Sequence, residues 1–276
     1  MAMKNAKMEL GTNRVLVKGR DGYFVANPRD KYVGGALITY GEFSHLEMDT
    51  FSKYVGRDTY VLEIGANIGA HTVGLASMCK FLDAVEPQPQ IFQNLVTNVF
   101  LNSLQNVGLH NIGIGMEQSF MFVPQTDYNA EGNFGGISLV NTPDEPVCAM
   151  VDILPMDSFR DSKYGKDVFV KIDVEGMELE VLKSGTKFIK NHRPVMYIEN
   201  DRPEKSKDLI QFLRDMSYDL YWDTPKLYNP NNFFGKREDK YLNTVSINML
   251  CLPKELECFV YSKEAVTTDM HPMFIK

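Results

Sequence analysis

The chain has 276 residues, of which 44% are hydrophobic, and this is enough to bury the core of a single domain with additions. Its formal net charge of −7 argues against a nucleic-acid partner, because proteins that bind a phosphate backbone usually present a basic surface. No apolar run approaches the roughly 20 residues that span a bilayer, and the first residues lack the apolar core of a secretory signal. We therefore expect a soluble, cytoplasmic protein without a membrane span.

The N-terminal part of the chain is expected to form a cap on the core. After a turn at Asn27 and Pro28, residues 42–55 place their apolar side chains on one face of a helix. We interpret residues 1–54 as this extension and residues 55–276 as the main domain.

Beyond the extension, segments typical of strands and helices alternate. Strands are expected over 59–66, 81–87, 106–114, 167–173, 194–200, 218–223 and 244–253, and helices over 69–79, 90–102, 177–191 and 206–217. Strands separated by helices predict right-handed crossovers, hence an α/β fold with a mainly parallel sheet covered on both faces. A ligand is then expected at the carboxyl ends of the strands.

Two long polar segments interrupt this alternation. Residues 117–147 are rich in Gly, Asn and Pro and predict an inserted loop or hairpin, and residues 223–240 predict a second loop with aromatic side chains. Long loops in a compact domain are more often lids or binding loops than plain connections.

The four cysteines are far apart and form no Cys-x-x-Cys pair; they are Cys79, Cys148, Cys251 and Cys258. We expect buried thiols rather than disulfides or a zinc site.

The stretch "VLEIGANIGAHT", residues 61–72, predicts a ligand-binding turn between a strand and a helix. The dinucleotide pattern G-x-G-x-x-G is absent, because Asn67 stands where the second glycine would approach a pyrophosphate. Glu63, two residues before Gly65, would repel a phosphate and attract a cation such as the ammonium group of an amino acid. This combination favours S-adenosylmethionine.

A second acidic residue follows at the end of the next strand. Glu86 comes 21 residues after Gly65, a distance at which a carboxylate can accept hydrogen bonds from both ribose hydroxyls, and Pro87 then turns the chain away. The alternative is that Glu63 and Glu86 are solvated strand ends.

Several stretches now follow one another in a characteristic order: "VLEIGANIGAHT", "AVEPQPQIFQNLVTNV", "ILPMDSF", "VKIDVEGMELEVLKSG" and "RPVMYIEND". They resemble the successive motifs of the FkbM family of S-adenosylmethionine-dependent methyltransferases, over about residues 55–201. "LYNPNNFFG" and "SINMLCLP" extend the resemblance. It implies a class I methyltransferase (Rossmann-like) fold, with a seven-stranded sheet whose last strand is antiparallel, and transfer to a hydroxyl oxygen.

The same resemblance implies where the cofactor binds. The residues expected to contact it are Glu63, Gly65, Ala66, Asn67, Gly69, Glu86, Pro87 and Asp173, with Asn111 near the adenine. Around Asn111 the segment "HNIGIG" departs from the usual alanine-glycine pattern of the family.

Acidic residues at two further strand ends could carry the chemistry. An alcohol is a poor nucleophile, so a general base must accept its proton or a metal ion must lower the pKa of its hydroxyl. Asp173 follows one strand and Glu199 and Asp201 follow the next, so these carboxylates could act as a base or converge on Mg²⁺. Alternatively, Asp173 binds the cofactor or caps a helix, and the other two are solvated.

His71, just after the glycine turn, is the best histidine candidate for a base. The alternative is a structural histidine that binds a main-chain group.

Three segments are expected to cap the strand ends and to contact the acceptor: residues 30–44, 133–138 and 227–235. Their Tyr, Phe, Asn and Ser side chains suit the apolar faces and hydroxyls of a saccharide. We expect an O-methyltransferase that acts on a hydroxyl of a saccharide, glycoconjugate or related small metabolite. A nicotinamide-dependent oxidoreductase and a non-catalytic binding module are the alternatives.

Overall fold

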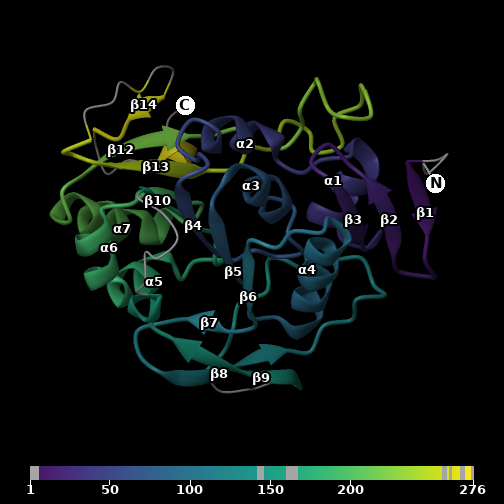
Figure 1. Ribbon diagram of the computed structural model, residues 1–276, viewed down its shortest axis with the longest axis horizontal. Coiled ribbons are helices and arrows are strands. Elements are labelled where there is room, and N and C mark those ends of the chain that lie inside the picture. The colour runs from purple at the N-terminus through teal and green to yellow at the C-terminus, as the bar shows by residue number, and fades with distance from the viewer. Residues whose placement is uncertain are drawn as a thin grey trace.

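The computed structural model describes residues 6–141, 146–159, 167–256, 260, 263–267 and 271–274. Its central element is a large, mostly parallel sheet (Figure 1). Across the sheet the strands are β14 (Glu264–Ala265), β12 (Tyr218–Asp223), β13 (Asn248–Pro253), β11 (Val195–Glu199), β10 (Asp167–Ile172), β4 (Thr59–Ile64), β5 (Phe81–Val85) and β6 (Val107–His110). Strand β13 lies between β11 and β12 and is antiparallel to both. The predicted sheet with an antiparallel last strand is confirmed, and the two-residue β14 extends it at one edge.

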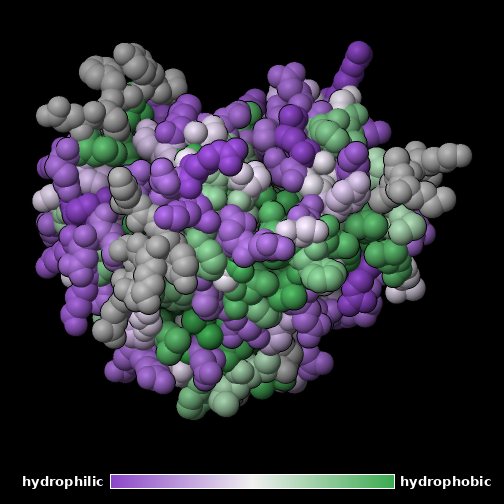
Figure 2. Space-filling model, in the orientation of Figure 1, coloured by the Kyte–Doolittle hydropathy of each residue, from purple (hydrophilic) through white to green (hydrophobic). Residues whose placement is uncertain are grey.

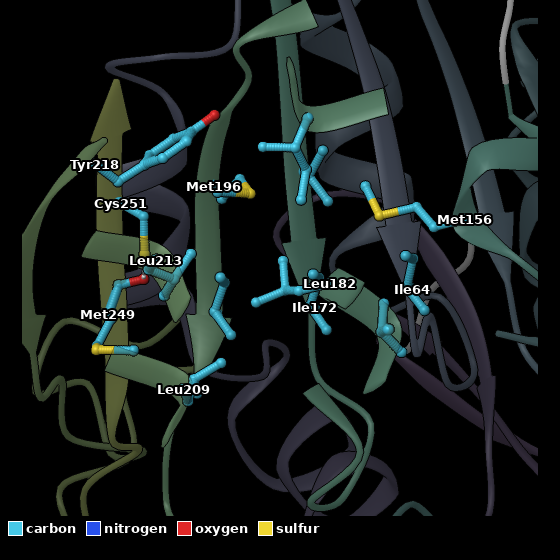
Figure 3. Packing of buried hydrophobic residues seen from close by; sticks show 14 of the residues in the cluster. Ile64, Met156, Ile172, Leu182, Met196, Leu209, Leu213, Tyr218, Met249 and Cys251 are labelled. Carbon is cyan, nitrogen blue, oxygen red and sulfur yellow. Dashed lines mark hydrogen bonds between the residues drawn. The ribbon is translucent and has the colours of Figure 1, made fainter. Parts of the chain in front are cut away.

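Helices cover both faces of this sheet. One face packs against α2 (His45–Phe51), α3 (Thr72–Met78) and α4 (Pro89–Leu101), and the other against α5 (Glu178–Ser184), α6 (Thr186–His192) and α7 (Pro203–Asp215). Figure 3 shows the second core, in which Ile172 and Met196 of the strands lie among Leu182, Leu209 and Leu213 of the helices.

The alternation of side chains along β4 and β10 positions two charged groups. Leu62 and Val170 point to the α5–α7 face, so their neighbours Glu63 and Lys171 point to the opposite face, toward α2 and α3. These two residues are also aligned with each other in the register of the parallel strands. A carboxyl group and an ammonium group are therefore placed side by side in an otherwise apolar layer.

Two of the expected elements are divided. The helix expected over 177–191 separates into α5 and α6 at Gly185, where an added Cβ would lie 2.4 Å from the sulfur of Met156. The strand expected over 106–114 separates into β6 and β7 (Gly113–Ile114), and β7 joins a second sheet with β8 (Ser119–Pro124) and β9 (Val147–Leu154). The expected insertion thus supplies one strand of this small sheet, at the bottom of Figure 1.

The N-terminal extension is more ordered than its sequence indicates. It forms an antiparallel sheet of β1 (Lys7–Glu9), β2 (Val15–Lys18) and β3 (Tyr23–Ala26), followed by α1 (Val33–Tyr40) and α2 (Figure 1). Asn98 of α4 ties this sheet to the core, because its amide binds the main chain of Val25 in β3 and the carbonyl of Ile68. The proposed division at residue 54 stays a prediction.

On the face drawn in Figure 2, hydrophobic side chains form a band among hydrophilic ones across the region of α4. Val96, Phe100 and Leu101 of this helix are exposed. Within the described ranges, no helix is both long and apolar enough to cross a membrane. Cys79 and Cys251 are buried free thiols, as expected, whereas the side chain of Cys148 and the whole of Cys258 lie outside the described residues.

Candidate functional site

A cavity of about 380 Å³ opens at the carboxyl ends of β4, β5, β10 and β11. A second, smaller cavity of about 60 Å³ adjoins it, and Gly65, Glu86 and Asp173 line both. The site therefore lies at the carboxyl ends of the parallel strands, where ligands bind in sheets of this kind.

The glycine turn after β4 is packed against the loop after β10. Gly65 has a φ of +85°, and a Cβ added to it would lie 1.8 Å from the carbonyl oxygen of Asp173. Asn67 has a φ of +52°, in the left-handed region that asparagine tolerates better than most residues. Only glycine at position 65 allows the two loops to approach this closely.

Glu86 holds the same turn in place from β5. Its two carboxylate oxygens accept hydrogen bonds from the main-chain N–H groups of Asn67, at 3.0 Å, and Gln88, at 2.8 Å. The residue is buried, and burial raises the pKa of Glu86 to about 7 although both hydrogen bonds act against this. Glu86 is therefore not a solvated strand end.

Glu63 is also buried rather than solvated. Its carboxylate accepts a hydrogen bond from the hydroxyl of Thr72, at 2.6 Å, and burial raises the pKa of Glu63 to about 7. Lys171, its neighbour on β10, binds the carboxylate of Asp173 at 3.1 Å. Burial alone would lower the pKa of Lys171, but the surrounding carboxylates raise it above its usual value, so this ammonium group stays charged.

The larger cavity is strongly acidic. Seven carboxyl groups line it: Glu47, Glu63, Glu86, Asp173, Glu175, Glu199 and Asp201. The cations that line it are Lys171 and Arg202. Burial raises the pKa values of Glu47 and Glu175 to about 7, as it does for Glu63 and Glu86. A cationic ligand in this cavity would thus favour the ionised form of these carboxyl groups and be attracted to it.

Glu199 differs from its acidic neighbours in having a buried oxygen that no described residue binds. Its Oε2 is buried and has no hydrogen-bond partner among the described residues. Burial, followed by the charges of Asp173 and Asp201, raises the pKa of Glu199 well above its usual value. Asp173 and Asp201, by contrast, bind Lys171 and the guanidinium of Arg202, the latter at 3.2 Å.

The predicted metal site does not fit this arrangement. Asp173 and Asp201 each face a cation, and within the described part of the chain no three His, Cys, Asp or Glu side chains are placed to hold a metal ion. The structure therefore does not support Mg²⁺ bound by Asp173, Glu199 and Asp201, and we derive no step through a metal.

His71 lines the cavity, as its position after the turn predicts. Its ring packs against Phe43 and Phe51, and burial lowers the pKa of His71 to about 3. Its Nε2 is buried without a partner among the described residues. A neutral ring of such low basicity can accept a hydrogen bond from a ligand but is a weak general base.

The remaining predicted cofactor residues fall into two groups. Ala66 and Asn67 line the larger cavity, and Pro87 lines the smaller one. Gly69 and Asn111 line neither: Gly69 shapes the turn with a φ of +84°, and the Asn111 amide binds the carbonyls of Glu86 and Pro87. The Asn111 N–H₂ group is thus used behind the turn, and a contact of this residue with an adenine stays a prediction.

Sequence reasoning missed Lys171 and Glu47. A lysine within the apolar run "VFVKI" is a detectable signal, since a buried lysine in a strand needs acidic partners. Glu47 gives no such signal, because an acidic residue in the short helix α2 is unremarkable until that helix is packed over β4 and β10.

All three expected cap segments reach the larger cavity. Tyr32, Val33 and Phe43 come from the first, Asn133 from the second and Leu227 from the third. The third segment contributes only Leu227, and residues 245–247, which immediately precede β13, also line the cavity.

The fold and the site define a class of protein. In the main sheet the antiparallel strand β13 is inserted beside β11, and the glycine turn follows β4. This arrangement is the class I methyltransferase fold. The family model described as "Methyltransferase FkbM domain" matches residues 63–220, more than half of the chain, and the chain belongs to this family.

Solved structures with similar folds include three methyltransferase-related proteins. The methyltransferase FkbM from Methylobacillus flagellatus KT is 17% identical with a TM-score of 0.42, and the match covers 80% of this chain and 55% of that one. The precorrin-6y C5,15-methyltransferase from Geobacter metallireducens GS-15 is 14% identical with a TM-score of 0.47, covering 75% and 88%. SMU.1697c from Streptococcus mutans, in complex with SAH, is 10% identical with a TM-score of 0.44, covering 75% and 96%.

The chain spans about half the length of the Methylobacillus protein. Among curated proteins there is no significant match.

Proposed function

We propose that this protein is an S-adenosylmethionine-dependent O-methyltransferase whose acceptor is a hydroxyl of a saccharide, a glycoconjugate or a related small metabolite. The observation that carries the proposal is the acidic cavity beside the glycine turn, in a chain of a methyltransferase family. Carboxylates in a buried site attract the ammonium and sulfonium groups of this cofactor. When bound, the cofactor supplies an electrophilic methyl group.

In the proposed arrangement the cofactor site extends across both cavities. The N–H groups from Gly65 to Asn67 are used within the protein, so the carbonyl of Gly65 and the carboxyl of Glu63 bind the ammonium group of the amino-acid end. Glu86 accepts hydrogen bonds from the ribose, since each of its oxygens has a second lone-pair site left after binding the turn. The smaller cavity, with apolar side chains such as Ile114 and Leu139, takes the adenine.

The acceptor would lie between the carboxyl edge of β10 and β11 and the cap segments. Phe43 and Tyr32 offer aromatic faces and Asn133 offers an amide, a combination that suits a sugar ring with its apolar faces and hydroxyls. The cap thus supports a polyol acceptor.

Glu199 is the group best placed to take the acceptor's proton. Its buried Oε2 is free to accept a hydrogen bond from a hydroxyl, whereas Asp173 and Asp201 each bind a cation through Oδ2. A cationic cofactor nearby would lower the pKa of Glu199 and favour its basic form. Asp173 holds Lys171 and orients the acceptor, and His71 accepts a hydrogen bond.

Ligand binding and methyl transfer test the proposal. S-adenosylhomocysteine should raise the melting temperature of the protein in a thermal-shift titration, and NAD should not. Labelled S-adenosylmethionine should transfer its methyl group to members of a panel of free and nucleotide-linked saccharides. A melting temperature raised by NAD alone would make the oxidoreductase correct, and cofactor binding without transfer to any hydroxyl compound would favour a binding module. Activity that persists in a chelator would agree with the absence of a metal step.

A further inference from the structure

A second concave surface lies beside the acidic cavity. This groove encloses about 680 Å³ and runs between the N-terminal cap and the loop that precedes β13. Part of its wall is a stacked pair of rings, Tyr32 and Tyr241, whose centroids are 6.1 Å apart with planes inclined by 11°. A flat aromatic surface of this kind is suited to an apolar ring face.

The groove adjoins the acidic cavity. Tyr32 lines both, Glu131 lines the groove two residues before Asn133 of the cavity, and Thr244 lines the groove just before Val245 of the cavity. Three chain segments therefore form the walls of both spaces.

Main-chain hydrogen bonds fix these segments to one another. Lys31 N–H donates to the carbonyl of Gly132 at 2.9 Å, and Gly132 N–H donates to that of Arg29 at 3.1 Å. The hydroxyl of Tyr241 donates to the carbonyl of Tyr32 at 3.0 Å. The groove is thus preformed, which limits the ordering cost of binding.

The charge of the groove is opposite to that of the cavity. Arg29, Lys31 and Lys240 line it, are exposed, and have no acidic partner within ion-pair distance among the described residues. Its acids are Glu131 and Asp30, and the buried carboxylate of Asp30 is occupied by N–H groups at the start of α1. In a chain with net charge −7, a groove with three unpaired cations points to an anionic ligand.

We propose that this groove binds the phosphate or diphosphate group of the acceptor, so that the substrate is a phosphorylated or nucleotide-linked saccharide whose hydroxyl enters the acidic cavity. The inference rests on the proposed function, because it assigns the acceptor's anionic part to the groove and its reacting part to the cavity. Exposed cations with rigid main-chain support bind phosphate oxygens through charge-assisted hydrogen bonds.

The probe is inorganic pyrophosphate, titrated calorimetrically into protein saturated with S-adenosylhomocysteine, so that the cofactor cavity is filled. The test variant is Arg29→Ala/Lys31→Ala/Lys240→Ala. The control is Lys53→Ala/Lys187→Ala/Lys207→Ala, which removes three exposed cations elsewhere and makes the same change in net charge. We expect pyrophosphate to bind the wild type and the control alike, and the test variant about tenfold or more weakly. Affinity should fall as salt concentration rises.

No pyrophosphate binding to the wild type, or equal binding to the test variant and the control, would overturn the proposal. Binding of S-adenosylhomocysteine is measured in the same samples and should be unchanged in all three proteins. If S-adenosylhomocysteine does not bind the wild type, the proposed function is wrong. The pyrophosphate titration then still tests the groove, through the difference in pyrophosphate affinity between the two variants.

Discussion

At the residue scale, the acids of the cavity differ in what already binds them. Glu86 is held by two main-chain N–H groups, and Asp173 by Lys171, but the buried Oε2 of Glu199 has no partner in the described chain. A buried polar atom without a partner costs free energy that a ligand can recover. We therefore assign the proton-accepting role to Glu199.

Replacement of Glu199 by glutamine separates binding from chemistry. We expect kcat to fall about 100-fold or more, because the amide cannot accept the proton, while cofactor affinity changes little. The protein should remain folded, since the amide also removes a buried acid. Kinetics and calorimetry measure the two effects, with the exposed Glu180→Gln as control. An equal loss of cofactor affinity would make Glu199 a cofactor residue instead.

Lys171 is the central counter-charge of the cavity. Lys171→Met would leave Glu63, Glu47 and Asp173 without it, and we expect a loss of about 3 kcal/mol in the free energy of unfolding at pH 8. This is the low end for buried pairs, because the side chain of Asp173 is 39% exposed. At pH 6 the loss should be smaller, since the glutamates are then largely protonated.

Denaturant unfolding at both pH values measures this difference. Lys187→Met, at an exposed position of α6, should change the free energy of unfolding little at either pH. The same cost for Lys171→Met at pH 6 and pH 8 would mean that its charge does not support the carboxylates.

At the scale of elements, the site depends on how closely the turn after β4 meets the loop after β10. The N–H groups of Gly65 and Ala66 both donate to the carbonyl of Val85 at the end of β5, and Asp173 N–H donates to the carbonyl of Ile64. Three neighbouring strands thus hold the turn. Its shape comes from their register as well as from its glycines.

Gly65→Ala tests this close approach. The new methyl group would collide with the carbonyl oxygen of Asp173, and the positive φ adds about 1–3 kcal/mol of backbone strain. We expect a lower melting temperature and loss of cofactor binding, measured by thermal unfolding and calorimetry. Gly235→Ala is the matched control, because Gly235 also has a positive φ but an added Cβ meets nothing within 4 Å. Similar effects of the two changes would show that strain alone is responsible.

At the scale of the whole molecule, the buried acids connect stability to pH. Glu47, Glu63, Glu86 and Glu175 have pKa values raised by burial to about 7, above the 4.5 of an unperturbed glutamate. Their contribution to stability is fully present below about pH 4.5 and is lost as the pH rises through 7. Burial lowers the pKa of His71 from 6.5 to about 3, so this residue makes the free energy of unfolding rise with pH, but only below pH 6.5.

The melting temperature of the ligand-free protein should therefore fall between pH 6.5 and pH 8.5. Saturating S-adenosylmethionine should reduce this fall, because its positive charge favours the ionised carboxylates and its affinity should rise over the same range. Thermal unfolding with and without ligand measures both effects. A melting temperature that rises with pH in the ligand-free protein would contradict the burial of these groups as acids.

The course of the chain through the main sheet could be predicted well, and the smaller sheets could not. Strands such as β4 and β10 are mainly apolar runs, with Glu63 and Lys171 as charged exceptions near their carboxyl ends, and helices follow them, so their pattern needs no tertiary information. The strands β1–β3 and β7 are short, and side chains of β1 and β8 are exposed, so apolar patterning alone does not mark these sheets. They form because α4 and the main sheet offer surfaces for them to pack on.

The sequence by itself determined the parallel strands joined by crossover helices, the glycine turn and the edge at which a ligand must bind, because these depend on local patterning and on the handedness of the chain. Only the tertiary structure decided which acids are free to act. It paired Asp173 with Lys171 and Asp201 with Arg202, left an oxygen of Glu199 without a partner, and brought Glu47 from α2 into the cavity. The reason is physical: the charge state of a carboxyl group depends on its burial and on neighbours from other strands, and neither is encoded within a short stretch of sequence.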